Sequence, residues 1–454
     1  MRSWRIVLSV GWVAIGAQGC ADTQSPDDES VADTVQAATV LGDPLPGTDL
    51  TAFNAARDNF AEEEDINDGL GPTFNEKACG NCHNLPVVGG SGANIERRFG
   101  RLTNGVFFGF DRAPDNEGGT LRQLFSNGTY VNGDVTCTIP QDQEAPTANI
   151  HNVGRRTTPL FGLGLIDAMP DAWFEFIQLT EPSSVRGTIV RVAPPIPDAR
   201  DPSQAIGKLR VSRFGLKAQE PGLLSFSADA YTNEMGITTQ SCYKGNSMLA
   251  FAFENYPNNV APPAGCNGGD LAPLNPADNP QIPVETDDVV GNCDDNRTEN
   301  QGDIANFLLF MERLAPPPRN ITNPIRFTLG AVQFANAGCA GCHSAVPFVT
   351  PSNPFNKVPG NMTFFPFSDF LVHDMGSLGD GIGATGDSAA TTRLMRTAPL
   401  WGARFNTQFL HDGRAPNIRA AIVAHDGQGA NAREAFRGLS ASNQQLIIDF
   451  VNAL

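Results

Sequence analysis

The sequence predicts a mainly α-helical, loop-rich fold that is built from two related halves and carries a small β-hairpin insertion. The pentapeptide C-x-x-C-H occurs twice, at 79–83 and at 339–343. A heptapeptide, RTTPLFG at 156–162, returns as RTAPLWG at 396–402, each copy downstream of its own pentapeptide. Such self-similarity indicates an internal repeat, although Thr-x-Pro and Gly also mark ordinary turns.

The helices are predicted from apolar residues at helical spacing. Phe327, Gly330 and Phe334 share one face of a segment that leads into the second pentapeptide. Another helix, 303–314, stops before three prolines at 316–318, the expected boundary between the halves. The last helix follows a capping pattern at Ser442 and Gln445, and its apolar face comprises Leu446, Ile447, Phe450, Val451 and Leu454. Residues 185–211 alternate in polarity, which favours a β-hairpin.

Two C-x-x-C-H pentapeptides in one chain indicate two covalently attached c-type haems. Both thiols of a pentapeptide add to the vinyl groups of one porphyrin, and the adjacent histidine binds the iron. The expected residues are Cys79, Cys82 and His83 in the first half, and Cys339, Cys342 and His343 in the second. Zinc knuckles would need further Cys or His pairs, and a redox C-x-x-C would need a βαβ setting. The fold prediction is therefore two c-type cytochrome domains.

The start of the chain predicts export. Two arginines precede an apolar run at 6–17 that is too short for a membrane span, which is typical of a signal peptide. The run ends at Gly19-Cys20, which resembles a bacterial lipobox, although Ala17 stands where Leu is usual. We expect a periplasmic protein that is lipid-anchored through Cys20, with a soluble periplasmic protein as the alternative. The expected segments are a signal peptide at 1–19, an acidic linker at 20–49, and haem domains at 50–320 and 321–454.

Charge and cysteine usage narrow the class of protein further. The formal net charge is −18, which makes nucleic acid an unsuitable partner. Of the nine cysteines, four lie in the pentapeptides and Cys20 fits the anchor; the others are Cys137, Cys242, Cys266 and Cys293. In an oxidising compartment these four suggest two disulfides, and the sequence does not choose among the three pairings.

Five further motifs give the chain a family resemblance. They are GLGPTFN at 69–75, PLFGLGLIDA at 159–168, NEMGIT at 233–238, HDMG at 373–376 and HDGRA at 411–415. In this order they resemble the di-haem oxidoreductase family, relatives of the bacterial di-haem cytochrome c peroxidases. The resemblance implies a fold of two c-type domains, with a catalytic first haem and an electron-transferring second haem.

The resemblance also assigns the second iron a distal ligand. His425 follows His411 by fourteen residues, where the similar peroxidases have a distal Met. With His343 and His425 as its two ligands, the second haem would have a lower potential than a His/Met haem. The alternative for His425 is an exposed residue at a helix end beside Asp426.

For the first haem the resemblance indicates a catalytic carboxylate. The counterpart of HDGRA is FGLKA at 214–218, and Glu234 stands sixteen residues beyond Ala218. By resemblance Glu234 matches the peroxidases' catalytic glutamate, which takes a proton from bound hydrogen peroxide and returns it to the departing oxygen. The alternatives are a surface glutamate in a turn, and closure of the iron by the thioether of Met235.

The remaining histidines and the arginines of the repeat have weaker assignments. His151 could cap the first haem, with a structural role as the alternative. His373 lies in a family motif and is expected near the second haem or between the halves. Arg396 is expected to bind a haem propionate, because a guanidinium pairs bidentately with a carboxylate. Arg156, its repeat mate, is expected to do likewise.

Two departures from the family pattern bear on mechanism. The peroxidases place a Trp between the haems, and this chain has Phe214 there, with Leu216 nearby. Rapid sharing of an oxidising equivalent between the haems is therefore in doubt. At the peroxidases' calcium site, Asn406 and Gln408 replace the usual Thr and Pro; calcium, Ca²⁺, stays an option through oxygen ligands.

Three functions fit these residues. The leading one is reduction of hydrogen peroxide at the His83 haem, with electrons delivered by a redox partner protein through the His343 haem. The second is an oxidase or oxygenase that acts on a protein or organic substrate by ferryl chemistry. The third is a non-catalytic electron-transfer cytochrome. An open iron separates the first two from the third, in which both irons are six-coordinate.

Overall fold

A computed structural model describes most of the chain after residue 39. The described residues are 40–66, 68–109, 119–143, 147–198, 200–205, 207–237, 240–243, 247–249, 266, 272–273, 283–284, 289–290, 303–355 and 358–454. Residues Thr34–Leu454 form one compact unit. The predicted signal peptide, the lipobox cysteine Cys20 and most of the acidic linker lie outside the described residues. Within the described ranges, no helix has the length and apolar character that a membrane span requires.

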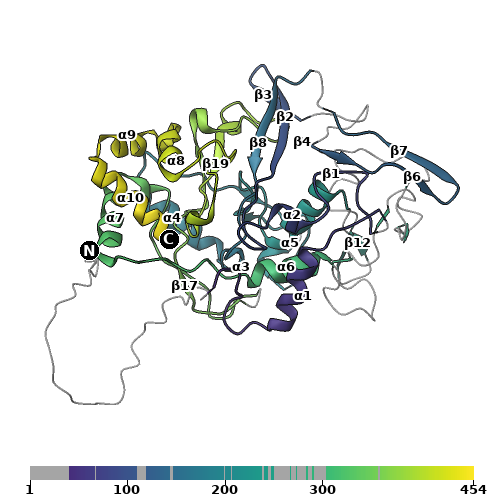
Figure 1. The fold of residues 1–454 in the computed structure, drawn as a ribbon, viewed down its shortest axis with the longest axis horizontal. Coiled ribbons are helices and arrows are strands. Elements are labelled where there is room, and N and C mark those ends of the chain that lie inside the picture. Colours follow the sequence, from purple (N-terminus) through teal and green to yellow (C-terminus); the bar gives the residue numbers. More distant parts are fainter. Residues whose placement is uncertain are drawn as a thin grey trace, which may run out of the picture. The chain divides into compact units, whose positions relative to one another are not determined.

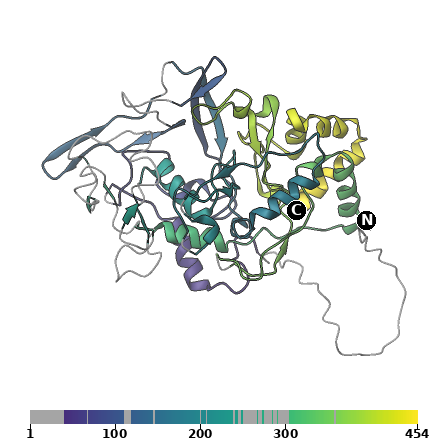
Figure 2. The same ribbon diagram turned by 180° about the vertical axis from the view of Figure 1, so that it is seen from behind.

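The predicted mainly α-helical class is wrong. Helices make up 34% and strands 17% of the structure, and the strands form several small sheets, so the fold is mixed α/β. Figures 1 and 2 show these strands at separate places in the fold rather than in one central sheet. The expected pair of c-type cytochrome domains is not shown either. Many of the strands have only two or three residues, which is too short to leave a period-2 pattern in the sequence.

Two pairs of packed helices flank the two pentapeptides (Figure 1). Helix α1 (Leu50–Phe60) packs against α6 (Asp303–Arg313), and α7 (Pro324–Asn336) packs against α10 (Ala441–Ala453). In each pair, two phenylalanines of the first helix contact one phenylalanine of the second. The ring centroids of Phe53 and Phe60 lie 5.5 and 5.0 Å from that of Phe310. Those of Phe327 and Phe334 lie 5.1 and 5.2 Å from that of Phe450. The two pairs therefore share one packing scheme.

The helix that ends the chain forms largely as predicted. Its N-cap is Ser440, whose side chain accepts from the Asn443 N–H, so the cap lies two residues before the predicted Ser442. Gly330 allows α7 to approach this helix closely, because a Cβ atom at that position would lie 2.4 Å from the Leu446 carbonyl oxygen. The predicted helix at 303–314 is likewise confirmed as α6.

The other helices and strands are short. The helices are α2 (Cys79–Cys82), α3 (Leu163–Asp167), α4 (Asp171–Thr180), α5 (Leu223–Ala230), α8 (Ile418–Ala424) and α9 (Ala430–Gly438). The largest sheet has four antiparallel strands, β2 (Ile95–Thr103), β3 (Val106–Phe108), β4 (Leu121–Arg122) and β8 (Ile150–Arg156). Four of the two-stranded antiparallel pairs are β1 (Thr73–Phe74) with β5 (Phe125–Ser126), β9 (Arg191–Val192) with β10 (Arg210–Val211), β16 (Phe348–Val349) with β17 (Thr363–Phe364), and β18 (Val372–Asp374) with β19 (Leu394–Arg396). Further short strands are β11 (Gln240–Tyr243), β12 (Ser247–Leu249), β13 (Ala272–Pro273), β14 (Pro283–Val284) and β15 (Val289–Val290).

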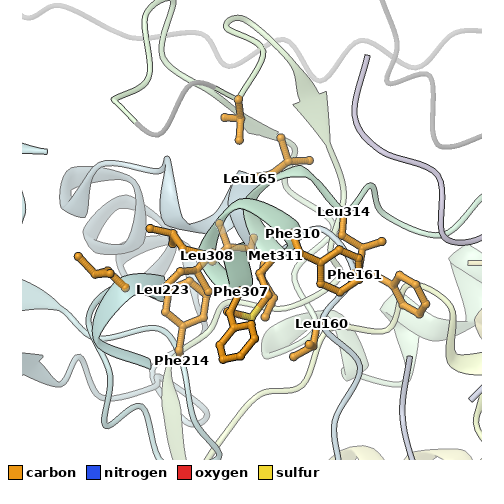
Figure 3. Close-up of a cluster of buried hydrophobic side chains, with 14 of the residues drawn as sticks. Leu160, Phe161, Leu165, Phe214, Leu223, Phe307, Leu308, Phe310, Met311 and Leu314 are labelled. Atoms are coloured by element: carbon orange, nitrogen blue, oxygen red, sulfur yellow. The ribbon is translucent and has the colours of Figure 1, made fainter. Parts of the chain in front are cut away.

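The main hydrophobic core surrounds helix α6. Figure 3 shows Phe307, Leu308, Phe310, Met311 and Leu314 of this segment in contact with side chains that come from other parts of the first half, namely Leu160, Phe161, Leu165, Phe214 and Leu223. A second core joins α7, α8, α9 and α10 around Phe450. Each pentapeptide therefore lies against its own hydrophobic cluster.

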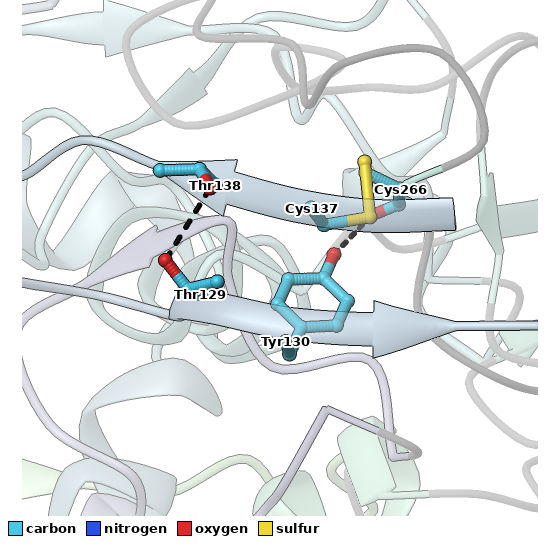
Figure 4. The surroundings of a disulfide bond; sticks show 5 residues. All are labelled: Thr129, Tyr130, Cys137, Thr138 and Cys266. Carbon is cyan, nitrogen blue, oxygen red and sulfur yellow. Dashed lines mark hydrogen bonds between the residues drawn. A yellow bond between two sulfur atoms is a disulfide. The ribbon is translucent and has the colours of Figure 1, made fainter. Parts of the chain in front are cut away.

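One disulfide lies in the described residues. Cys137 of strand β7 (Val135–Ile139) is bonded to Cys266, with a Cα–Cα distance of 5.4 Å. The hydroxyl of Tyr130, on the paired strand β6 (Gly128–Asn132), donates to the Cys266 carbonyl (Figure 4). The partner of Cys242 stays a prediction, because Cys293 lies outside the described residues.

Candidate haem sites

The first pentapeptide presents His83 from the end of a short helix. The backbone N–H of His83 donates to the Cys79 carbonyl, with an N–O distance of 3.0 Å. The ring Nδ1–H donates to the Gly90 carbonyl at 3.3 Å, and the Phe60 ring centroid lies 6.1 Å from that of the imidazole. Burial lowers the pKa of His83 to about 4, so the ring is neutral at pH 7. A neutral imidazole with its Nδ1 hydrogen-bonded to a carbonyl is the form that binds a metal through Nε2.

The second pentapeptide repeats this arrangement. The backbone N–H of His343 donates to the Cys339 carbonyl at 3.0 Å, and its Nδ1–H donates to the Phe367 carbonyl at 3.0 Å. The Phe334 ring centroid lies 6.4 Å from that of His343. Burial, with a contribution from His425, lowers the pKa of His343 to about 4. The two predicted proximal ligands are therefore held in the same way.

The repeated heptapeptide braces both histidines. The backbone N–H of Leu160 donates to the Gly89 carbonyl, and that of Leu400 donates to the Pro366 carbonyl, each at 2.9 Å. Gly89 and Pro366 directly precede Gly90 and Phe367, whose carbonyls accept hydrogen bonds from the rings of His83 and His343. The glycines that end the two copies, Gly162 and Gly402, both have left-handed backbone, with φ of 71° and 68°. The two copies of the heptapeptide therefore occupy equivalent places in the structure, as an internal repeat predicts.

The cysteines of the pentapeptides fit attachment of a haem. Their four thiols are free, and burial raises the pKa of each of them. Each pair therefore stands unoxidised beside a neutral histidine, as addition to porphyrin vinyl groups requires. The residues present suit two c-type haems, although the covalent attachment itself stays a prediction.

His425 lies at the end of helix α8, on the side of the second pentapeptide. Its Nδ1–H donates to the Ala421 carbonyl at 2.8 Å, and burial lowers its pKa. His425, when protonated, would contribute to lowering the pKa of His343, after burial as the main cause. His425 therefore has the neutral form and the neighbourhood that a second ligand of the same iron needs.

The two halves contain matching hairpins before the helices that face the pentapeptides. Phe214 pairs with Glu220 in the first hairpin, and Phe409 pairs with Ala415 in the second. Left-handed backbone occurs at the same two places in each hairpin. In the first hairpin, φ is 77° at Gly215 and 52° at Ala218; in the second, it is 69° at Leu410 and 75° at Gly413. Phe214 therefore corresponds to Phe409.

This correspondence shifts the sequence-based pairing of FGLKA with HDGRA by two residues. Helices α5 and α8 begin nine residues after Phe214 and Phe409, respectively. The position that His425 occupies in the second half is consequently occupied by Ala230 in the first. Alanine has no ligand atom, so this position would supply no distal ligand to a haem at the first site.

Glu234 stands one turn beyond Ala230, in a π-helical turn that spans Tyr231–Met235. Such turns often occur at functional sites. The Asn75 Nδ2–H donates to Glu234 Oε2 at 2.7 Å. Burial and the nearby Glu96 carboxylate raise the pKa of Glu234 to about 8, and Glu234 also acts electrostatically on the Cys82 thiol. Glu234 is therefore a proton-binding group beside the first pentapeptide.

The sequence alone did not single out the residues around Glu234. The guanidinium of Arg98 binds Glu96 through Nε and Nη2, at 2.9 and 3.2 Å. Although burial opposes ionisation, Arg98 holds the pKa of Glu96 below its usual value. Two features of the sequence could have identified these residues. Asn75 is the last residue of the GLGPTFN motif, and Glu96 and Arg98 stand two residues apart on strand β2, so both side chains lie on the same face of the strand. Met235, the alternative ligand, places its Sδ 4.0 Å from Cys79 Sγ.

Arg396 and Arg156 offer donors for an anion. Burial lowers the pKa of Arg396 to about 10, its Nε–H donates to the Gly215 carbonyl at 2.7 Å, and the described residues include no carboxylate in a salt bridge with it. Arg156 has a buried Nε without an acceptor among the described residues, and its Nη1–H donates to Asn406 Oδ1 at 3.3 Å. A haem propionate would satisfy either guanidinium.

The other two histidines have clear positions. His151 is exposed on strand β8. His373 is buried beside the second pentapeptide, with Nδ1 3.6 Å from Cys342 Sγ and Nε2 3.0 Å from Asp369 Oδ2. Cys342, Asp369 and His373 could together hold a metal ion, but a Cys342 that is bonded to haem has no thiolate left for one. At the expected calcium position, the Asn406 oxygen already accepts from Arg156.

The halves exchange backbone hydrogen bonds through the repeat. The N–H of Arg156 donates to the His411 carbonyl at 2.6 Å, and the N–H of Arg396 donates to the Leu216 carbonyl at 2.8 Å. His411 and Leu216 correspond in the two hairpins, as Arg156 and Arg396 correspond in the repeat. Each heptapeptide therefore binds the hairpin of the opposite half.

A buried ion cluster adds to this junction. Asp380, whose side chain is fully buried, accepts from the Arg155 guanidinium at 2.7 Å and pairs with Lys217 Nζ at 2.8 Å. The Lys217 ammonium also donates to the carbonyls of Thr392 and Leu394, both at 2.8 Å. Charges buried in this way must remain paired, so the cluster holds the halves in one arrangement.

The fold and the sites together define a protein with two equivalent histidine–cysteine sites, one with a second histidine and one without. Residues 286–454 match the family model described as "Di-haem oxidoreductase, putative peroxidase". This is the family that the sequence motifs predicted, and the match supports an oxidoreductase with haem as its cofactor.

Two further comparisons give little likeness. No curated protein matches the chain. A solved structure of hydrazine synthase from Kuenenia stuttgartiensis is 16% identical, with a TM-score of 0.23 over 35% of this chain. The chain spans 57% of the length of that structure's chain.

Proposed function

We propose that the chain is a di-haem c-type oxidoreductase that reduces hydrogen peroxide at the haem held by His83. The observation that carries the proposal is the difference between the two equivalent distal positions. His425 follows helix α8 in the second half, whereas Ala230 stands at the corresponding position in the first half, and this difference supports a distal imidazole ligand at the second haem alone. An iron without a distal side chain can bind a small oxidant, so peroxide chemistry belongs at the first haem and electron transfer at the second.

Glu234 is the proton carrier of the proposed reaction. When bound, the first haem supplies the iron that binds peroxide and the electrons that break its O–O bond. The Glu234 carboxylate would take one proton from hydrogen peroxide and give it to the departing oxygen, which leaves as water. Asn75 fixes the carboxyl group. A pKa raised to about 8 gives Glu234 a proton affinity that suits an acid–base group working near neutral pH.

The second half delivers electrons in this proposal. Two histidine ligands, His343 and His425, would close the second iron to substrate and favour outer-sphere electron transfer. A redox partner protein supplies one electron at a time. The predicted export signal and lipid anchor at Cys20 support a periplasmic location for this reaction, at the membrane surface.

Spectra of the holoprotein test the proposal. Chain matured in a host that attaches c-type haems should give one high-spin and one low-spin ferric signal by electron paramagnetic resonance. With a reduced soluble c-type cytochrome as donor, it should consume one hydrogen peroxide for every two electrons, without incorporation of oxygen into an added organic substrate. Two low-spin signals and no peroxide consumption would instead identify an electron-transfer cytochrome. Peroxide-dependent insertion of oxygen into a substrate would identify an oxygenase.

A further inference from the structure

Tyr231 is a buried phenol with acidic neighbours. It opens the π-helical turn after α5, and 1% of its surface is exposed. Its hydroxyl donates to Asp303 Oδ2 at 3.0 Å and lies 3.4 Å from Glu64 Oε1. The other oxygen of Asp303 accepts from Asn59 Nδ2 at 2.6 Å, which fixes the carboxylate. A phenol held on a carboxylate can release its proton without exposure to water.

Tyr231 also lies close to the first haem site. Its ring centroid is 5.1 Å from that of Phe307, which is 5.6 Å from Phe60, and Phe60 is 6.1 Å from the His83 ring. On the same turn, four residues later, Met235 contacts the Cys79 thiol. A continuous series of packed aromatic rings therefore joins the phenol to the proximal histidine.

The acidic neighbours of Tyr231 are also near the attachment cysteine. Burial is the main cause that raises the pKa of the Cys79 thiol, and the carboxylates of Glu64 and Asp303 add to it. The phenol, its proton acceptor and the haem edge that Cys79 would bind consequently occupy one small region. This region lies in the first half, where the proposed peroxide reaction takes place.

We propose that Tyr231 is a redox-active residue that stores one oxidising equivalent for the first haem site. The inference rests on the proposed function, because hydrogen peroxide is the oxidant. Peroxide accepts two electrons and two protons and becomes two molecules of water. Tyr231 supplies one of these electrons through the first haem, the second haem supplies the other, and the two protons come from solvent. The Tyr231 O–H proton passes to Asp303 Oδ2, so a neutral tyrosyl radical remains. One electron from the second haem and the proton on Asp303 then re-form the O–H bond.

The physical reason for the acceptor is the cost of a buried charge. A phenol that lost an electron and kept its proton would be a cation in an apolar core, which is strongly disfavoured. Transfer of the proton to Asp303 leaves both groups neutral. Tyr231 thus provides an oxidisable side chain near the first haem site.

Rapid-freeze electron paramagnetic resonance after mixing with hydrogen peroxide tests the inference. The holoprotein is prepared with ordinary and with ring-deuterated tyrosine, and the chain's four tyrosines keep the assignment tractable. The wild-type protein should give a radical signal that narrows on deuteration. Tyr231→Phe should lose this signal and still consume peroxide. The matched control is Tyr130→Phe, whose hydroxyl contacts Cys266 in the β6–β7 hairpin; it should keep the signal.

Asp303→Asn is a second, independent test, which examines the proton acceptor. It keeps the inference testable even if Tyr231→Phe fails to fold. Without the carboxylate, the tyrosyl signal should be lost although Tyr231 is present. Peroxide consumption without a deuterium-sensitive signal in the wild-type protein, or an unchanged signal in Tyr231→Phe, would overturn the role of Tyr231 and leave the proposed function intact. A wild-type holoprotein that consumes no peroxide would overturn the proposed function, and this inference with it.

Discussion

Ala230 occupies, in the first half, the backbone position that His425 occupies in the second. Both residues follow a hairpin of the same conformation and end the helix that comes after it. In the proposed sites, this position would put an imidazole beside one iron and a methyl group beside the other. This single difference between two otherwise similar environments divides the proposed roles of the two haems.

Restoring a histidine at the first site should close it. We expect Ala230→His to convert the high-spin ferric signal of the first haem into a low-spin signal and to suppress its reaction with hydrogen peroxide. Electron paramagnetic resonance and stopped-flow absorbance measure the two effects. Ala230→Val, which adds bulk but no ligand atom, is the matched control and should stay high-spin. A high-spin signal that survives in Ala230→His would show that this position does not face the iron.

Removing the histidine of the second site should open it. His425→Ala is expected to convert the low-spin haem into a high-spin or weakly ligated form, because the iron loses its second imidazole. Redox titration with optical detection measures the potential at the same time. His151→Ala removes an exposed histidine and serves as the control. An unchanged spectrum and potential in His425→Ala would rule out ligation by this residue.

Glu234→Gln should slow peroxide activation with little effect on haem content. The amide keeps the shape of the side chain but cannot accept the proton. Acid–base groups contribute a factor of about 10² to 10⁴ in rate, so a loss of that size is expected. Stopped-flow mixing with peroxide at equal haem occupancy measures it. Equal rates in the two proteins would remove Glu234 from the mechanism.

The pH dependence of peroxide activation follows from the same carboxyl group. Burial and the Glu96 charge raise the pKa of Glu234 to about 8. The base form is the deprotonated one, so the rate should rise with pH and level off above about pH 8. Glu96→Gln removes the neighbouring negative charge and should move this inflection to lower pH. A flat profile between pH 6 and pH 9 would contradict the assignment.

Asp380→Asn should weaken the junction between the halves. The substitution leaves the Arg155 guanidinium and the Lys217 ammonium without their shared carboxylate in a buried place. Breaking one partner of a buried ion pair typically costs about 3–5 kcal/mol of unfolding free energy. Urea unfolding of the holoprotein measures the change. Asp58→Asn, which breaks an exposed pair with Arg57, should change the stability little. Equal stability of the two variants would mean that Asp380 does not hold the halves together.

The sequence predicts the chemistry-bearing positions better than the fold. C-x-x-C-H fixes spacing by covalent chemistry, so Cys79–Cys82 and Cys339–Cys342 needed no tertiary information. The α6 and α10 helices also show in the sequence, because their apolar periodicity spans three turns. Short strands such as β4 and β9 leave no such pattern, and the α-helical class was therefore wrong.

The partners of Glu234 illustrate the other limit. Asn75 is 159 residues from Glu234 in the chain, and no local rule connects them. The hairpin correspondence was off by two residues because FGLKA and HDGRA share only a final alanine, whereas backbone torsions define the true match. Hydrogen-bond partners and register depend on tertiary contacts, which local patterns do not contain.

The crossed hydrogen bonds of Arg156 and Arg396 have a consequence for how the protein matures. The ribosome delivers the N-terminal half first, but the carbonyl that receives the Arg156 N–H belongs to His411. The segment that braces His83 therefore stays incomplete until nearly the whole chain has been synthesised. Haem attachment at Cys79 and Cys82 can precede that moment, since the pentapeptide is local. The first site acquires its cofactor early and its final shape last.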